Sequence, residues 1–377
     1  MLALAASREV SVRSVEEARP CPGLSVPVVT ALDAEGDLVD ADQRAIVRHV
    51  LQDGYGADVV FAAGTTGEWD KVDNDVRQRV VQVSVEEVAK ANARRSPAEG
   101  GRPVEAWAGV TAPSRGETLA NLDFAIACGA DAAVIAPLSI ENVDDPVRFV
   151  ARDVSDLLDA RARRIPVYLY DNADIALDKK THIRTRQVKA MSRLDFVRGI
   201  KVSASRRVLG NYTKAAAGFR ERGEFGIYVG NAMLIFELFR PHSGWLGVIE
   251  EHWNRYRLRG GIPIGVVSGP ANALPREWAR AWQVSRAGDG ERMDEVRSVL
   301  EAFREATQAA GGKRSIACLK RALRCMGVVG SDAVAPGTPA LGPDDAERFD
   351  AAFARVRELS RERIGAPWIS QPPEERA

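Results

Sequence analysis

The residue in this sequence best suited to covalent chemistry is a lysine near the end of an apolar, β-branched stretch. Lys201 follows residues 196–200 and precedes Val202 and Ser203. A solvated lysine has a pKa of ~10.4 and is protonated at neutral pH, so it cannot attack a carbonyl. Burial in apolar surroundings lowers that pKa by up to ~3–5 units and leaves a free amine that can form a Schiff base. The alternative is that Lys201 merely ends a strand and extends its ammonium group into water.

Two further groups of polar residues follow apolar runs elsewhere in the chain. Small residues and two hydroxyls, Thr65 and Thr66, lie in the loop at residues 63–68, where they can offer hydrogen-bond donors to an anion. A phenol and a carboxylate, Tyr170 and Asp171, end another apolar run. A structural turn would explain the loop. Core packing would explain one tyrosine but explains the pair Asp171 and Asn172 less well.

The elements that must position these residues are short, continuous apolar runs rich in Val, Ile and Ala. Such runs are typical of parallel strands that are buried on both faces. Eight of them occur, at residues 26–32, 58–63, 104–110, 132–138, 166–170, 196–202, 225–229 and 262–267. Helical patterns with apolar residues at spacings of three and four lie between them, including one that begins at Asp145 and Pro146.

This eightfold alternation predicts an α/β fold, a (β/α)8 TIM barrel with a C-terminal three-helix appendage. The predicted divisions are an N-terminal arm at residues 1–24, the barrel at 25–285, a C-terminal helical region at 286–365 and a tail at 366–377. An aromatic-containing insertion at about residues 241–261 interrupts the barrel; it could form a lid or an oligomer contact, and packing is the favoured interpretation. In such barrels the active site lies at the carboxyl ends of the strands, where Lys201 is expected.

Composition narrows the possible partners. Lysine and arginine together number 52, as do aspartate and glutamate, so no net field favours nucleic acid or an anionic membrane. The apolar start of the chain stops at Arg8, too early for a signal peptide, and no run is long enough to span a bilayer. We therefore expect a cytoplasmic protein with a small-molecule partner.

Metal and disulfide chemistry is not indicated. The four cysteines form no CxxC pair, and the four histidines are scattered without ligand spacing. We expect no metal and no cofactor.

Several motifs resemble those of the dihydrodipicolinate synthase and N-acetylneuraminate lyase family of class I, Schiff-base aldolases, over about residues 26–349. Residues 64–68 resemble the family's GTTGE loop, and residues 199–201 its G-I-K strand. Residues 168–171 are similar to its L-Y-N segment, residues 229–231 to its S-G-D/N turn, and residues 265–275 to a segment ending in A-N-x-x-P. Matches in this order, at the ends of strands, are more specific to the family than any one motif.

The resemblance implies roles for individual residues. Lys201 would form the Schiff base, Thr65 and Thr66 would bind the carboxylate of a 2-oxo acid, and Gly230 would lie near the bound pyruvyl group. The family also implies a homo-oligomer, a dimer or tetramer.

The sequence departs from the family at the group that moves protons. Ser139 stands where the family has the tyrosine of its P-x-Y motif, and Asp171 stands where it has an amide. Tyr170 is the first candidate to replace the missing tyrosine, followed by Asp171 or a water molecule held by Ser139.

The predicted function is a class I lyase or aldolase that acts on pyruvate or a pyruvate-derived aldol. A hydratase-aldolase or dehydratase of the same family is one alternative. A barrel that binds a 2-oxo acid without catalysis is the other.

Overall fold

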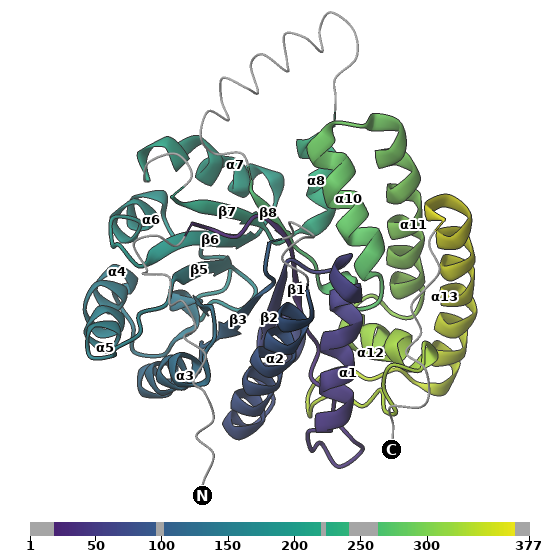
Figure 1. Ribbon diagram of the computed structural model, residues 1–377, viewed down its shortest axis with the longest axis horizontal. Coiled ribbons are helices and arrows are strands. Elements are labelled where there is room, and N and C mark those ends of the chain that lie inside the picture. The colour runs from purple at the N-terminus through teal and green to yellow at the C-terminus, as the bar shows by residue number, and fades with distance from the viewer. Residues whose placement is uncertain (1–18, 96–101, 220–223, 241–262, 366–377) are drawn as a thin grey trace, which may run out of the picture.

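The structure is a computed structural model that describes residues 19–95, 102–219, 224–240 and 263–365. Eight parallel strands close into a barrel in chain order, with each strand paired to its sequence neighbours and β1 paired to β8. The predicted (β/α)8 barrel with C-terminal helices is confirmed (Figure 1). The strands are β1 (Gly23–Pro27), β2 (Val59–Ala62), β3 (Glu105–Gly109), β4 (Ala132–Ile135), β5 (Val167–Asn172), β6 (Val197–Ser203), β7 (Gly226–Val229) and β8 (Gly265–Val267).

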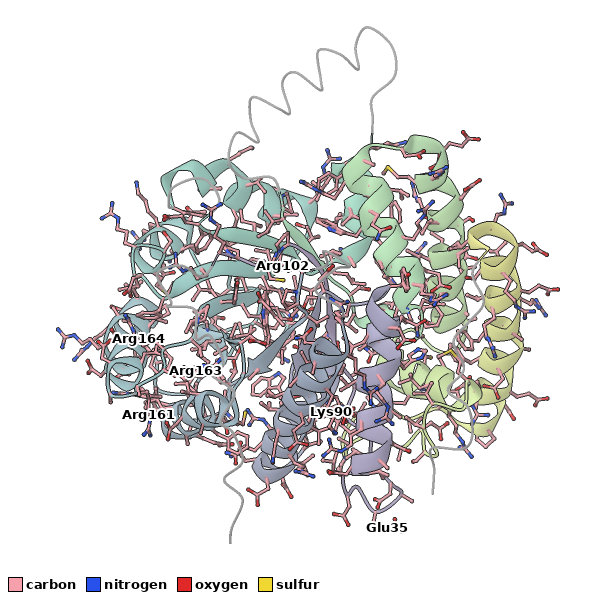
Figure 2. The ribbon with its side chains drawn as sticks, viewed as in Figure 1. Glu35, Lys90, Arg102, Arg161, Arg163 and Arg164 are labelled. Atoms are coloured by element: carbon pink, nitrogen blue, oxygen red, sulfur yellow. The ribbon has the colours of Figure 1, made fainter. Side chains whose placement is uncertain are left out.

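Helices between and after the strands cover the outside of the barrel (Figure 1), and side chains extend outward from them (Figure 2). They are α1 (Asp40–Leu51), α2 (Asn74–Arg94), α3 (Arg115–Cys128), α4 (Pro146–Arg148), α5 (Ser155–Asp159), α6 (Thr185–Met191), α7 (Arg206–Ala215), α8 (Ile235–Leu238) and α10 (Pro275–Ala287). A π-helical turn at Phe149–Val154 joins α4 to α5. Asp145 caps α4 by accepting hydrogen bonds from two backbone N–H groups, and Pro146 occupies its first turn, as the sequence predicts.

The first strand begins earlier than the sequence pattern indicates. It covers Gly23–Pro27, so the barrel begins two residues before the predicted boundary at residue 25 and the apolar residues 28–32 lie beyond the strand. Side-chain amides supply backbone hydrogen bonds there: the Val29 N–H donates to Asn272 Oδ1, and the Ala31 N–H donates to Gln43 Oε1. These bonds satisfy the backbone N–H groups of a buried apolar segment that lies outside the sheet.

Aromatic side chains fill the barrel interior at the amino-terminal end of the strands. The rings of Trp107 and Tyr168 stack with centroids 4.0 Å apart, and Tyr228 meets both edge-on. The Tyr228 hydroxyl donates to the carbonyl of Cys21, which lies just before β1. Glycine makes room for these rings, since a Cβ at Gly199 would lie 2.9 Å from the ring of Tyr168.

The C-terminal region consists of α11 (Gly290–Ala309), α12 (Ser315–Cys325) and α13 (Pro343–Ile364), which lie beside α10 on one flank of the barrel (Figure 1). Phe303 of α11 and the pair Phe349 and Phe353 of α13 form an aromatic cluster with centroids 5.7–6.2 Å apart. Burying each such ring stabilises the region by roughly 1.5–3 kcal/mol. The insertion at 241–261 and the tail at 366–377 lie outside the described residues.

Across the described residues, every helix is too short or too polar to cross a membrane.

A buried histidine in α1 makes stability sensitive to acid. Burial lowers the pKa of His49 to about 4, although a hydrogen bond to the backbone of Asn272 opposes this. An unfolded chain binds this proton near pH ~6.5, so folding should be fully supported above that pH and lose about 3 kcal/mol as pH falls to 4. Urea unfolding of wild type and His49→Gln between pH 7 and 4 should give a shallower pH slope in the variant; equal slopes would contradict the assignment.

Candidate active site

Lys201 lies inside the barrel because of the alternation of side chains along β6. Ile200 and Val202 pack toward the helices, whereas Lys201 points into the barrel and is only 6% exposed. Its Nζ lies 3.8 Å from the ring centroid of Tyr170 and 5.1 Å from that of Phe61. The amine therefore lies against aromatic faces, as the predicted buried lysine requires.

Tyr170 is the centre of a hydrogen-bond network at this position. It is paired with Lys201 across β5 and β6. Its hydroxyl lies 3.3 Å from Thr65 Oγ1, accepts from Asn172 Nδ2 at 3.0 Å and accepts from Ser203 Oγ at 3.4 Å. Burial raises the pKa of the Tyr170 phenol, but the charge of Lys201 and these hydrogen bonds outweigh it, so the pKa lies below its ordinary value.

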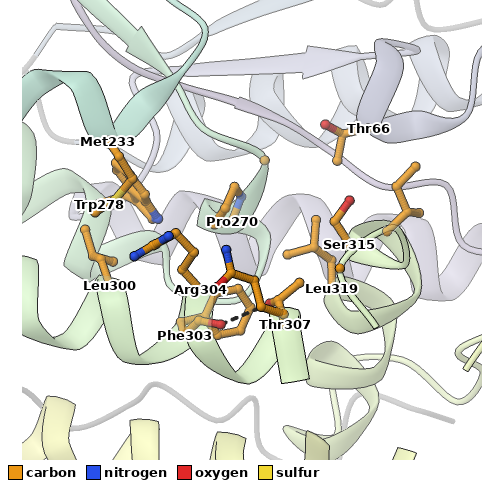
Figure 3. Close-up of a pocket in the computed structure, with 14 residues that line it drawn as sticks. Thr66, Met233, Pro270, Trp278, Leu300, Phe303, Arg304, Thr307, Ser315 and Leu319 are labelled. Atoms are coloured by element: carbon orange, nitrogen blue, oxygen red, sulfur yellow. Dashed lines mark hydrogen bonds between the residues drawn. The ribbon is translucent and has the colours of Figure 1, made fainter. Parts of the chain in front are cut away.

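The loop after β2 brings its two threonines to different places. A 3-10 turn at Thr65–Gly67 follows Gly64, where a Cβ would lie 2.9 Å from the Phe61 ring. Thr65 faces Tyr170, as the contact between their hydroxyls shows. Thr66 instead lines a cavity between the barrel and the C-terminal helices (Figure 3). The structure thus joins only Thr65 to the Lys201 and Tyr170 cluster.

Gly230 makes space for Ser203 at the end of β7. Its N–H donates to the carbonyl of Val202 at 2.8 Å, which holds the two strand ends together. A Cβ at Gly230 would lie 2.1 Å from Ser203 Oγ. Glycine is therefore required here if Ser203 is to reach the Tyr170 hydroxyl.

Residues 20–94 match the model of the dihydrodipicolinate synthetase family. Two proteins from strains of Halobacterium salinarum, both described as uncharacterized DapA-like lyases, are each 32% identical to this chain over 187 residues. Over these parts of the sequence the chain is similar to the dihydrodipicolinate synthase family. That match covers 48% of the chain and 53% of each relative, so the chain spans about half the length of the curated relatives it matches.

Solved structures of a dihydrodipicolinate synthase, of a protein from the dihydrodipicolinic acid synthase family and of a sialic acid aldolase share the fold over nearly their whole length. Dihydrodipicolinate synthase from Bacteroides thetaiotaomicron superposes with a TM-score of 0.70 at 19% identity, covering 90% of this chain and 99% of the other. YagE from E. coli K12, solved in complex with pyruvate, gives 0.69 at 18% identity, covering 89% and 98%. Sialic acid aldolase from Ruminococcus gnavus gives 0.69 at 14% identity, covering 91% and 99%.

The predicted role of Asp171 at the barrel mouth needs correction. Asp171 follows Tyr170 on β5 and therefore points to the opposite side of the sheet, toward the helices. One carboxylate oxygen lies 2.8 Å from His182 Nδ1, and the other accepts from the N–H of Ile183 at 2.8 Å. Both oxygens hold the segment before α6, so Asp171 is not placed to transfer a proton at Lys201.

Ser139 lies at the end of the 3-10 turn Pro137–Ser139 that follows β4, and it is 4% exposed. Within the described part of the chain, its hydroxyl makes no hydrogen bond. The structure does not connect it to the Tyr170 network.

Two residues of the network, Ser203 and Asn172, are not among the predicted site residues, although strand periodicity selects both. Ser203 lies two residues after Lys201 on β6, and Asn172 lies two residues after Tyr170 on β5. Side chains two positions apart share a face of a strand. Counting by two from each predicted site residue would have selected Ser203 and Asn172 and rejected Asp171.

The glutamate of the GTTGE loop anchors the C-terminal region rather than the reaction centre. Glu68 Oε2 lies 2.6 Å from Lys320 Nζ of α12, and both side chains are at least 97% buried. Glu68 Oε1 also accepts from the N–H of Ala335, and Lys320 donates to the carbonyl of Ala333. The loop that carries Thr65 is thus fixed to the C-terminal region.

Proposed function

We propose that this protein is a class I lyase or aldolase that forms a Schiff base between Lys201 and a 2-oxo acid, with pyruvate or a pyruvate-derived aldol as substrate. The observation that carries the proposal is the placement of a buried lysine amine against Tyr170, whose hydroxyl contacts Thr65 of the GTTGE loop. A nucleophile, a proton carrier and a binding loop meet at the carboxyl ends of three strands, which is where barrel enzymes perform catalysis.

The chemistry follows from the order of these groups. The Lys201 amine attacks the keto carbon, and loss of water leaves an iminium that withdraws electrons from the neighbouring bond. Thr65 orients the substrate by binding its carboxylate, so that the carbonyl faces the amine. Tyr170 transfers protons during formation of the iminium and at the neighbouring carbon, a contribution typically worth ~10²–10⁴-fold. Tyr170 thus performs the proton transfer that Ser139 cannot perform, because a serine hydroxyl does not titrate near neutral pH.

Reductive trapping tests the proposal. The protein is incubated with pyruvate, reduced with borohydride and digested, and the peptide that contains Lys201 is examined by mass spectrometry. We expect an adduct at Lys201 that is lost in Lys201→Ala, while the variant controls for reaction at surface lysines. If pyruvate and a panel of larger 2-oxo acids leave Lys201 unmodified, the Schiff-base proposal is wrong.

Product analysis then separates the candidate reactions. Release of pyruvate from hydroxy-oxo acids supports an aldolase, whereas loss of water from them supports the hydratase-aldolase or dehydratase alternative. Binding of pyruvate without proton exchange at its methyl group would support the non-catalytic alternative.

The Ser203 hydroxyl should set the upper pH limit of activity. As a proton donor, Tyr170 becomes inactive when pH rises through its pKa, which lies below the ordinary ~10. Ser203 donates to the phenol oxygen and stabilises the phenolate, so Ser203→Ala should raise the pKa and move the alkaline limb of the pH profile upward. Ser268→Ala is the matched control, since that buried hydroxyl at the end of β8 has no partner among the described residues. If the alkaline limb of the pH profile is the same in Ser203→Ala as in wild type, the role of Tyr170 is contradicted.

We also propose a homo-oligomer, a dimer or tetramer, on the basis of the family resemblance. Sedimentation velocity at micromolar protein would test this, and a monomer would contradict it.

A further inference from the structure

A cavity of about 400 Å³ lies between the end of the barrel at β8 and helices α10–α12 (Figure 3). We name it the β8–α11 cavity. Thr66 and Gly269 form its barrel side. Its body is apolar and is lined by Met233, Pro270, Leu300, Phe303, Ile316 and Leu319. A volume of this size accommodates a small organic molecule.

An indole N–H without a partner belongs to the lining of the β8–α11 cavity. Trp278 of α10 is 2% exposed, and its Nε1 has no hydrogen-bond partner among the described residues. Leaving such a buried donor unsatisfied is unfavourable, because it has lost its hydrogen bond to water without gaining another. An acceptor brought by a ligand would remove that cost.

A positive charge lies at the same cavity. Arg304 of α11 lines it and extends toward Trp278, as Figure 3 shows. The structure gives Arg304 no ion pair within the described ranges, and none of the described lining residues is acidic. Arg304 is exposed on its helix, so its long side chain can reorient around a ligand without any change in the backbone.

We propose that the β8–α11 cavity binds a small carboxylic acid with an apolar body. The carboxylate pairs with the Arg304 guanidinium and accepts from the Trp278 N–H, and the apolar part packs against Leu300 and Phe303. Two donors without an acceptor match the two oxygens of a carboxylate. Lys201 and Tyr170 are not among the lining residues, so binding to the cavity can be measured without Schiff-base formation.

Two kinds of molecule could present such a carboxylate to the cavity. One is the far end of an extended substrate, and the other is a separate effector molecule. Thr66 borders the cavity and is the neighbour of Thr65, which contacts Tyr170. An occupant of the cavity therefore lies against the same loop that we propose to bind the substrate carboxylate.

Calorimetric titration with 3-phenylpropanoate tests the proposal on the full chain. We expect binding by wild type, and binding at least about tenfold weaker for the neutral isostere 3-phenylpropanamide, because hydrogen bonds to a charged acceptor are stronger than those to a neutral one. Arg304→Gln should weaken binding of the acid by a similar factor, while Arg355→Gln, an exposed arginine of α13 outside the cavity, should not. Trp278→Phe removes the N–H and should also weaken binding.

The outcomes separate this proposal from the proposed function. Binding should persist in Lys201→Ala, whether or not Lys201 forms a Schiff base. Competition between 3-phenylpropanoate and pyruvate trapping would identify the cavity as part of the substrate site, and simultaneous binding would identify an effector site. Equal affinity for the acid and the amide, or unchanged affinity in folded Arg304→Gln, would overturn the proposal.

Discussion

Lys201→Arg should reduce turnover of a 2-oxo acid substrate by at least about 10⁴-fold, because a guanidinium remains protonated and cannot attack a carbonyl. Arginine keeps a positive charge beside Tyr170 and Phe61, so the variant removes the nucleophile while retaining the field that lowers the pKa of Tyr170. Steady-state kinetics and mass spectrometry after borohydride reduction measure the two consequences, which are lost turnover and lost adduct.

A lysine-to-arginine change outside the site is the control for this prediction. Lys189→Arg changes a lysine in the last turn of α6, away from the Tyr170 network, and should leave turnover unchanged. If Lys201→Arg retained activity within tenfold of wild type, another group would carry the reaction and the role assigned to Lys201 would be wrong.

Glu68→Gln should destabilise the protein by about 3–5 kcal/mol, the cost of leaving a buried charge without its partner. Lys320 would lose its charged partner and keep only neutral acceptors, which are the carbonyl of Ala333 and the new amide oxygen. Burial already lowers the pKa of Lys320, against the opposing effect of Glu68, so loss of Glu68 should lower that pKa further. Denaturant unfolding with an unchanged m-value would measure the loss.

A double variant distinguishes the effect of losing one charge of the pair from any effect of changing side-chain shape in the loop. Glu68→Gln combined with Lys320→Met removes both charges while nearly preserving volume, and it should recover most of the lost stability. An exposed pair, Arg292 and Asp289, provides the comparison, since Arg292→Gln should change stability by less than about 1 kcal/mol. If Glu68→Gln lowered the free energy of unfolding no more than Arg292→Gln does, the anchoring role of Glu68 would be contradicted.

Periodicity explains why the barrel could be predicted and why Lys201 was found. The parallel strands are mostly apolar, and Lys201 stands near the carboxyl end of one of them. The same alternation along β5 places Asn172, and not Asp171, on the face of the strand that carries Tyr170.

Contacts between distant segments could not be predicted in this way. Glu68 and Lys320 meet only because α12 folds back against the loop after β2, and nothing local to either residue indicates the other. The beginning of β1 was also missed, because the buried residues 28–32 look like a strand although Gln43 and Asn272 replace the sheet partners. The helical stripes predict the C-terminal helices, but the cavity they enclose depends on how they pack.

The aromatic rings of Trp107, Tyr168 and Tyr228 close the amino-terminal end of the barrel interior. Lys201 can then be reached from one direction only, so an entering molecule and a leaving product share a single route. In the reaction that we propose, the 2-oxo acid held on Lys201 occupies the base of that route, so a second substrate would have to bind after it. The closed end of the barrel then predicts an ordered kinetic sequence, which product-inhibition patterns would test.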